Sequence, residues 1–267
     1  MGPTASVNVV QLSGACVRHR ADEVAVEEPL EIRLGFGPLA NRNRLTLAIA
    51  MRTPGPDAEL AIGFALAEGI LRDASDLLAV VPLAANVVRL DLHPDASFDA
   101  AKLVRHGLTT SSCGLCGKTS LDAVTRDLDP LPAGFAVRAE LLGELPEKLR
   151  AAQPAFARTG GLHAAGLFDA RGNLLAARED VGRHNAADKL FGHRLGESNA
   201  ACILTVTSRA SFELVQKAAV AGVPVFVAVG APTSLAVELS HRANMALVGF
   251  ARGASFNVYA GAERIVA

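Results

Sequence analysis

Two cysteines separated by two residues, Cys113 and Cys116, are the clearest chemical feature of the sequence. They lie in a polar stretch rich in threonine, serine and glycine, where the hydrophobic periodicity of the flanking segments lapses. Residues 100–121 contain no aspartate or glutamate and carry a local charge of +3 from Lys102, Arg105 and Lys118. Positive charge near a thiol favours the thiolate, which is its nucleophilic form. We therefore expect residues 106–121 to form a mobile loop with reactive sulfur chemistry.

Four kinds of site are compatible with this pair. Half of a zinc site would need two further ligands from Cys16, His106, His163 or Cys202, and no second pair of this spacing exists. A thioredoxin-like dithiol should stand at the start of a helix directly after a strand, whereas a loop is predicted here. A persulfide carrier needs an accessible thiolate on a segment that can visit two partners. A purely structural pair is the fourth possibility. Cys202 itself lies in a predicted buried strand and is expected to be a small core residue.

Polar residues at the starts of two predicted helices are candidates for binding an anion. In Glu179–Asn185, Asp180 is expected to cap the helix that follows, and Arg183 and His184 are candidate donors to a phosphate at its N-terminus. Thr207–Ser211 follows a predicted buried strand and opens another helix. Ligands of open α/β sheets gather at such places, so this segment either contacts a ligand or serves as a simple helix cap.

A third candidate is Gly249–Ser255, which we expect to be the turn of a hairpin with a glycine at positive φ. Arg252 can pair with a pyrophosphate, and Gly253 lets backbone amides approach it. The other polar groups have simpler interpretations. His163 either faces a ligand or is a structural histidine, and Glu27–Glu28 and Arg42–Arg44 are expected to be solvated strand ends.

The elements that must position these residues fall into two groups. The first is an N-terminal α+β unit with a helix over Ala58–Leu71, capped by Asp57 and apolar on nearly all sides, so that we expect it to be buried. Its strands are predicted from apolar alternation over residues 32–36, 45–51, 80–83 and 87–92.

The second group is C-terminal and alternates strands with helices, after short helices over 120–128 and following Pro146. A hairpin is predicted over 162–168 and 173–178, then strands over 202–208, 223–229, 246–251 and 256–259 and helices over 183–191, 211–221 and 233–245. Such alternation indicates an α/β fold with a mixed, mainly parallel sheet covered by helices. We predict three parts: an N-terminal α+β domain over 1–105, the loop over 106–121, and a C-terminal domain over 122–267.

Composition excludes several classes of protein. The chain has 267 residues, of which 50% are hydrophobic and 20% charged, so it can bury a large core without disulfides. Its 26 basic and 27 acidic residues nearly cancel, which removes a general attraction to nucleic acid or to an anionic membrane. We see no signal peptide and no transmembrane helix, and four scattered cysteines indicate reduced thiols, so we expect a cytoplasmic protein.

Six motifs in order resemble the FdhD family of accessory sulfurtransferases for formate dehydrogenase. The motifs are Arg52–Gly55, Glu59–Phe64, Ser111–Lys118, Thr159–Ala165, Glu179–Asn185 and Ser208–Glu213. The resemblance implies that persulfide sulfur passes from a cysteine desulfurase to this chain and then to a molybdenum cofactor with two pterin guanine dinucleotides. It also implies a cytidine-deaminase-like fold for the C-terminal domain, with helices on both faces of its sheet. The deaminase zinc motif is absent, because His163-Ala164-Ala165 lacks the required glutamate.

The resemblance implies a role for particular residues. Cys113 is then the persulfide site, and Cys116 assists or resolves it. The family's cofactor segment maps onto six consecutive residues, Phe250, Ala251, Arg252, Gly253, Ala254 and Ser255. Ala254 and Ser255 supply little charge, so cofactor binding is expected to depend on Arg252 and its neighbours. The molybdenum bis(molybdopterin guanine dinucleotide) is a bound substrate, and no permanent cofactor or metal is expected.

Two other functions remain open at this point. One is a binding protein that shields the molybdenum cofactor during insertion without catalysis, and the other is a nucleotide-processing hydrolase of the deaminase fold. The expected partners are a cysteine desulfurase, formate dehydrogenase and the cofactor. The apolar helix over Asp57–Leu71 and the apolar strands suggest a large buried interface, so we also expect a homodimer.

Overall fold

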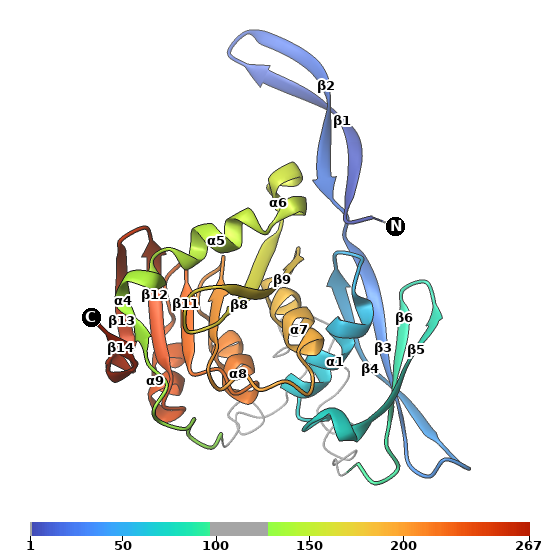
Figure 1. Cartoon of the computed structure of the whole chain (residues 1–267). Helices are drawn as coiled ribbons and strands as arrows, with labels where there is room; N and C mark the ends of the chain where they lie inside the picture. The colour runs from blue at the N-terminus through green and yellow to red at the C-terminus, as the bar shows by residue number, and fades with distance from the viewer. Residues whose placement is uncertain (1, 97–127) are drawn as a thin grey trace.

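The computed structural model describes residues 2–96 and 128–267. These residues form a projecting N-terminal hairpin, a four-stranded sheet with one long helix, and a six-stranded sheet with helices on both faces (Figure 1). The fold class predicted from the sequence, α/β with a smaller α+β unit in front, is confirmed. The division into domains at 105 and 121 remains a prediction, since both boundaries lie outside the described residues.

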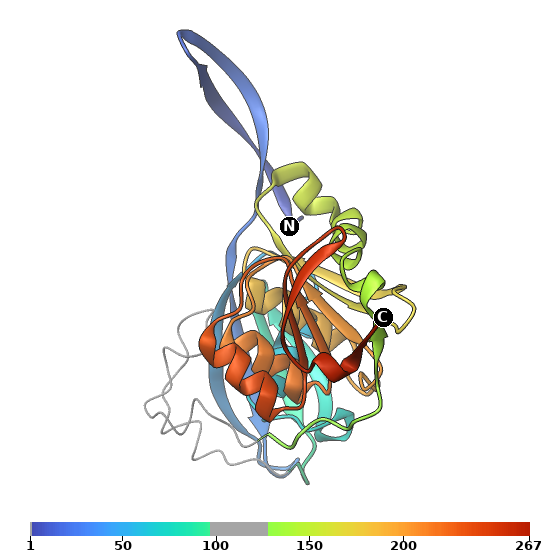
Figure 2. The ribbon, with the colours of Figure 1, turned by 90° about the vertical axis from the view of Figure 1, so that its left-hand side faces the viewer.

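The hairpin was not predicted. It consists of β1 (Thr4–Ser13) and β2 (Cys16–Ala25), which pair antiparallel along their whole length around a turn with Gly14 at a φ of 59°. Both views show it standing away from the rest of the chain (Figures 1 and 2). We call this hairpin the arm.

The four-stranded sheet has the order β4-β3-β6-β5, with β3 and β6 parallel and the other pairs antiparallel. Its strands are β3 (Glu28–Phe36), β4 (Asn43–Arg52), β5 (Leu77–Ala84) and β6 (Val87–Leu92), and a 3₁₀ turn, η1 (Ala74–Asp76), precedes β5. Leu30, Ile32 and Leu34 alternate toward one face and are fully buried, because that face packs against the helix α1.

Helix α1 (Asp57–Ala67) is buried, as predicted, but it ends before the expected Leu71. Gly69 adopts a φ of 65° two residues beyond it, a left-handed conformation that ends a helix readily. The expected capping by Asp57 is wrong, because no side chain caps this helix and Asp57 is its first residue.

The six-stranded sheet has the order β13-β12-β11-β10-β8-β9. Strands β10, β11 and β12 are parallel and the other three neighbouring pairs are antiparallel, so the sheet is mixed, as predicted, but it is not mainly parallel. The strands are β8 (His163–Phe168), β9 (Leu174–Asp180), β10 (Ile203–Val206), β11 (Val225–Ala228), β12 (Ala246–Arg252) and β13 (Ser255–Ala260). All were predicted within a few residues from their apolar runs.

Helices cover both faces of this sheet, as expected (Figure 2). On one face α7 (Arg183–His193), α8 (Phe212–Val220) and α9 (Ser234–Arg242) enclose a core that includes Leu204, Phe226 and Leu247. On the other face α4 (Ala139–Leu142) and α5 (Leu145–Ala151) pack over Phe168 and Val248. The alternation of side chains along the strands sends neighbouring residues into these two separate cores.

Short elements close the fold at its edges. They are α6 (Pro154–Thr159), η2 (Ala262–Arg264) and the parallel pair β7 (Val137–Arg138) and β14 (Ile265–Val266). Arg264 is buried and donates to the carbonyl oxygens of Asn244 and Pro132, which ties the C-terminus to the segment before β7. Burial lowers the pKa of Arg264. None of the described helices has the length and apolar character that crossing a bilayer requires.

Candidate functional site

The carboxyl edge of the six-stranded sheet gathers most of the motifs that the sequence singled out. The parallel strands β10, β11 and β12 end at this edge, and because β8 and β9 alternate in direction, β8 begins and β9 ends there. The helices α7, α8 and α9 all start from it. The segments brought together are Gly160–His163, Asp180–His184, Thr207–Ser211 and Phe250–Ser255. Open α/β sheets bind their ligands at such an edge.

The loop after β10 is fixed by its backbone and presents an arginine. Ala164 N donates to Thr207 Oγ1 at 2.9 Å, and Gly230 N donates to Ser208 O at 3.1 Å. A Cβ atom on Gly230 would lie only 3.0–3.2 Å from atoms of Arg209, so a glycine is needed for this close approach. The Arg209 side chain is exposed and forms no ion pair with the described residues.

The predicted hairpin between β12 and β13 is present, with Gly253 at a φ of 56°. Arg252 pairs with Ser255 across the turn, and the Arg252 side chain is exposed without an ion-pair partner in the described part of the chain. The pairing shifts register between Gly249 and Arg252, and at this bulge Phe250 adopts a φ of 54°. The Phe250 side chain is 50% exposed. An aromatic residue is strained in the left-handed region, and such strain concentrates at functional sites.

The start of α7 differs from the expectation. Gly182 is the N-cap and no side chain caps the helix, so the predicted cap role of Asp180 is wrong. His184 is buried, with Nε2 3.4 Å from Ser211 Oγ and 3.8 Å from Glu213 Oε2. The Nε of Arg183 is buried and has no hydrogen-bond partner among the described residues. Ser211 is the N-cap of α8, also without a side-chain cap bond.

The environment of His163, at the start of β8, favours its neutral form. Burial lowers the pKa of His163, and the positive charge of Arg183 lowers it further. The predicted alternatives for His163 were a ligand contact and a structural role. Its position at the carboxyl edge beside an arginine is compatible with either.

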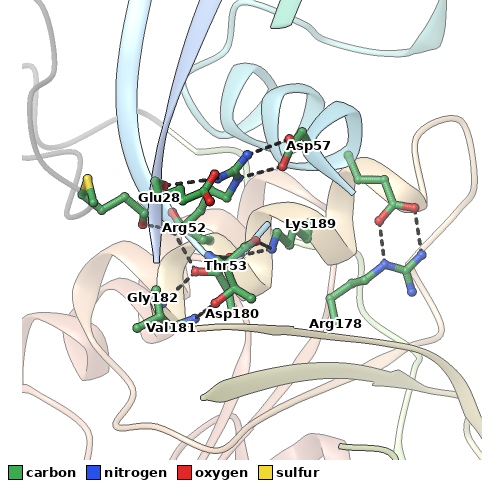
Figure 3. Close-up of polar contacts among 12 residues, drawn as sticks. Glu28, Arg52, Thr53, Asp57, Arg178, Asp180, Val181, Gly182 and Lys189 are labelled. Carbon is green, nitrogen blue, oxygen red and sulfur yellow. Dashed lines mark hydrogen bonds and ion pairs between the residues drawn. The ribbon is translucent and has the colours of Figure 1, made fainter. Parts of the chain in front are cut away.

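Asp180 instead holds the two sheets together. Its carboxylate is fully buried and accepts four hydrogen bonds, from Thr53 N, Gly182 N, Asn185 Nδ2 and Lys189 Nζ (Figure 3). The bond from Lys189 is 2.5 Å long, and the Lys189 side chain is 1% exposed. A buried charge is tolerated when it is paired and hydrogen-bonded in this way.

The contacts of Thr53 complete this cluster. Val181 N donates to Thr53 Oγ1 at 3.1 Å, and Lys189 Nζ donates to Thr53 O at 2.7 Å (Figure 3). Asn185 Nδ2 also donates to Met51 O at 2.7 Å. The end of β4 and the start of α7 are therefore joined by buried bonds between residues that lie far apart in the sequence. We call the set Thr53, Asp180, Asn185 and Lys189 the clamp.

Arg52 supports the clamp from the four-stranded sheet. Its guanidinium makes two bonds of 2.8 Å to the Asp57 carboxylate and lies 3.7 Å from Glu28 Oε2 (Figure 3). It also donates a bond of 2.7 Å to Asn86 Oδ1. The expectation that Glu28 is a solvated strand end is therefore wrong. The same expectation for Arg42 is also wrong, because Arg42 donates a hydrogen bond to the carbonyl oxygen of Leu92 at 2.7 Å.

A second ion pair joins α1 to β9. Arg178 binds both carboxylate oxygens of Glu59, at 2.6 and 2.8 Å, and His193 Nδ1 lies 3.0 Å from the same carboxylate. Burial raises the pKa of Glu59, but the bonds and charges of Arg178 and His193 outweigh it and leave that pKa lowered. The helices approach closely here, because a Cβ on Gly63 would lie 1.8 Å from Asp188 O.

Comparison with known proteins assigns a family to this arrangement. The model of the FdhD/NarQ family matches residues 25–266. This chain belongs to the FdhD/NarQ family. Its relatives include the sulfur carrier protein FdhD of Streptomyces coelicolor, 48% identical over 96% of this chain and 94% of the relative, and that of Mycobacterium tuberculosis, 45% identical over 98% of each. A crystal structure of a putative formate dehydrogenase accessory protein from Desulfotalea psychrophila has the same fold, with a TM-score of 0.81, 22% identity and coverage of 99% of this chain and 100% of that one.

Five of the six motifs that carry the family resemblance lie in the described residues. Arg52–Gly55 and Glu179–Asn185 meet in the clamp, and Glu59–Phe64 lies on α1, which packs against α7. Thr159–Ala165 and Ser208–Glu213 lie at the carboxyl edge of the larger sheet. The motifs thus mark the edge and the contact between the two sheets.

The predicted cysteine site, with Cys113, Cys116, Arg105 and Lys118, falls outside the described residues. Cys202 is buried, as predicted, and burial raises its pKa. Across residues 2–96 and 128–267, no three of His, Cys, Asp and Glu come together as a possible metal site.

The clamp was not predicted, although the sequence carries one signal of it. Asp188 and Lys189 stand between Ala186–Ala187 and Leu190–Phe191, on a stretch of helix that is otherwise apolar. Charged residues at such positions are either at a helix surface or paired in the interior, and here Lys189 is paired with Asp180 and Asp188 with Lys217.

Proposed function

We propose that this chain is a sulfur carrier for formate dehydrogenase, with Cys113 as its persulfide site, and that it acts as a sulfurtransferase. It would accept sulfur from a cysteine desulfurase and pass it to the molybdenum bis(molybdopterin guanine dinucleotide) before the cofactor is inserted. Family membership over residues 25–266, with named sulfur carriers at 45–48% identity, is the observation that supports this most strongly.

Loading is an exchange between a thiolate and a persulfide. The Cys113 thiolate attacks the terminal sulfur of the desulfurase persulfide, an S–S bond forms on Cys113, and the donor cysteine leaves with the electron pair of the broken S–S bond. This step involves no net oxidation. Delivery as sulfide reduces that sulfur by two electrons, which Cys116 supplies by attacking Cys113 Sγ, so that a Cys113–Cys116 disulfide forms and HS⁻ leaves for the metal. A cellular dithiol then reduces the disulfide.

The carboxyl edge fits the guanine nucleotide parts of this substrate. Arg209 and Arg252 are exposed, and neither has an ion-pair partner in the described residues, so their guanidinium groups are available to phosphate oxygens. The absence of a Cβ at Gly253 lets backbone amides come close to a phosphate. Phe250 presents a half-exposed ring on which a guanine base can stack, a use that would explain its strained backbone.

Mass spectrometry after reaction with a cysteine desulfurase and cysteine tests the proposal. We expect an adduct of about 32 Da, the mass of one sulfur atom, on Cys113. Cys113→Ser should abolish it, whereas Cys16→Ser, a matched control at an exposed cysteine, should not. If the unmodified chain gains no sulfur yet binds GDP, the chain is the non-catalytic cofactor-binding protein instead.

We further propose a homodimer in the cytoplasm, where thiols stay reduced. The apolar helix α1 is buried within the chain and gives no support for the dimer, so light scattering must test it.

A further inference from the structure

The arm has an unprotected edge. A hairpin of two strands leaves one backbone edge free on each strand, and the ten residues of β1 carry neither a charge nor a proline. Proteins normally protect long free edges with charges, prolines or bulges, because such edges pair with other strands. The free edge of β2 has this protection from Arg18, Arg20, Asp22 and Glu23, and the edge of β1 has none.

The two faces of the arm differ in character. The register pairs Leu12 with Val17 and Val10 with His19, so these side chains share a face, on which Val10, Leu12 and Val17 are 55–71% exposed. Arg18, Arg20 and Asp22 lie on the other face, where Arg20 pairs with Asp22 at 3.2 Å, so this face carries a net charge of +1. An isolated two-stranded hairpin with an exposed apolar face is marginally stable in water, which indicates that something covers it.

The base of the arm lies beside the carboxyl edge. Arg158 of α6 binds both carboxylate oxygens of Glu23, at 2.5 and 2.8 Å. A Cβ on Gly161 would lie 3.6 Å from the Ala25 Cβ, and Gly161 is two residues before His163 at the start of β8. A protein bound along the arm is therefore held at the same edge of the six-stranded sheet as the segments that are proposed to carry the nucleotide cofactor.

Edge-to-edge pairing with a second copy of the chain compensates neither face. An antiparallel pairing of two β1 strands would satisfy both neutral edges. It would also place the arginines of both copies on one face and join the two apolar faces into a larger exposed one. A partner segment with acidic residues toward Arg18 and Arg20 and apolar residues toward Leu12 and Val17 neutralises the first face and covers the second.

We propose that the arm binds the protein that receives the cofactor, by adding an acidic, partly apolar strand of that protein to the free edge of β1. This inference rests on the proposed function, because the recipient is then the cofactor-free formate dehydrogenase. Strand addition supplies affinity through main-chain hydrogen bonds and selectivity through alternate side chains. The arm base lies at the edge proposed to hold the cofactor, and this position favours the recipient of the cofactor as the partner.

The test measures how tightly the full chain binds cofactor-free formate dehydrogenase. It compares the unmodified chain with two variants, Leu12→Glu and a double variant that carries Arg18→Glu and Arg20→Glu. We expect each to weaken binding at least tenfold, with the affinity for GDP and the persulfide loading unchanged. Leu39→Glu is the matched control, since Leu39 is also highly exposed, at 65% against 71% for Leu12, but lies outside the arm. It should bind like the unmodified chain.

Each other outcome overturns the inference in a distinguishable way. Arm variants that bind formate dehydrogenase normally contradict a docking role. Arm variants that turn a dimer into monomers assign the arm to a second copy, and variants that lose loading by the desulfurase assign it to the sulfur donor. If the unmodified chain does not bind cofactor-free formate dehydrogenase at all, the partnership in the proposed function is wrong as well.

Discussion

Removing the Asp180 carboxylate should destabilise the protein more than removing its lysine partner. Asp180→Ala leaves the Lys189 ammonium, 1% exposed, with Thr53 O as its remaining bond within the clamp. Breaking a buried ion pair from one side costs about 3–5 kcal/mol. Lys189→Met leaves Asp180 with bonds from Thr53, Gly182 and Asn185, so its cost should be nearer that of a single charged hydrogen bond, about 1.5–3 kcal/mol.

Urea unfolding followed by circular dichroism gives these free energies of unfolding, because the chain has no tryptophan to report by fluorescence. The double variant should cost less than the sum of the single variants by about 0.5–3 kcal/mol, the usual coupling between contacting residues. Arg20→Ala is the control. It removes an ion pair with Asp22 in which the two side chains are 50% and 41% exposed, so it should cost under about 1 kcal/mol. Additive effects, or a larger cost for Lys189→Met than for Asp180→Ala, would refute the described bonding of the clamp.

Three further outcomes follow from the site. Replacing Arg252 by alanine should weaken GDP binding in calorimetry by about 1.5–3 kcal/mol, the range of a charge-assisted bond, and an unchanged affinity would exclude Arg252 as the phosphate ligand. Gly143→Ala should also weaken GDP binding, because its Cβ would lie 1.6 Å from Gly253 O and displace the turn; a normal Kd would show that the turn is not used. Because the pKa of Glu59 is lowered in the folded chain, its stabilisation is present above its ordinary pKa and is lost as the pH falls through the lowered value. Glu59→Gln should therefore destabilise the chain at pH 7 in urea titrations and do so progressively less as the pH falls below the ordinary pKa of glutamate, and a loss that does not change with pH would contradict this linkage.

The C-terminal sheet could be predicted from the sequence because its strands are short apolar runs between well-marked helices. Runs such as Ile203–Val206 and Val225–Ala228 are buried on both faces, which leaves few alternatives for their structure. The turn at Gly253 was also predictable, since glycine adopts positive φ without strain. Hydrophobic periodicity does not show which polar residues form contacts. Thr53 and Asp180 are hydrogen-bonded although they are 127 positions apart in the sequence.

The arm escaped prediction for a related reason. Its side chains are almost all exposed, so no buried face imposes an alternation on β1, and Val9 and Val10 even stand side by side. The roles of Asp57 and Asp180 were also not predicted. Both were expected to cap helices, because acidic residues before a helix usually do. Buried cations, Arg52 and Lys189, take those carboxylates instead. A pattern of local preferences does not contain these long-range partners.

The most direct test of the sulfur-carrier proposal follows one labelled sulfur atom. The chain is loaded with ³⁴S by a cysteine desulfurase and labelled cysteine, freed from the donor, and mixed with sulfur-free molybdenum cofactor and cofactor-free formate dehydrogenase. We expect the label in the cofactor of the matured enzyme together with formate oxidation, and neither with Cys113→Ser. Equal maturation by Cys113→Ser, or an active enzyme without the label, would contradict the claim that this chain carries the sulfur.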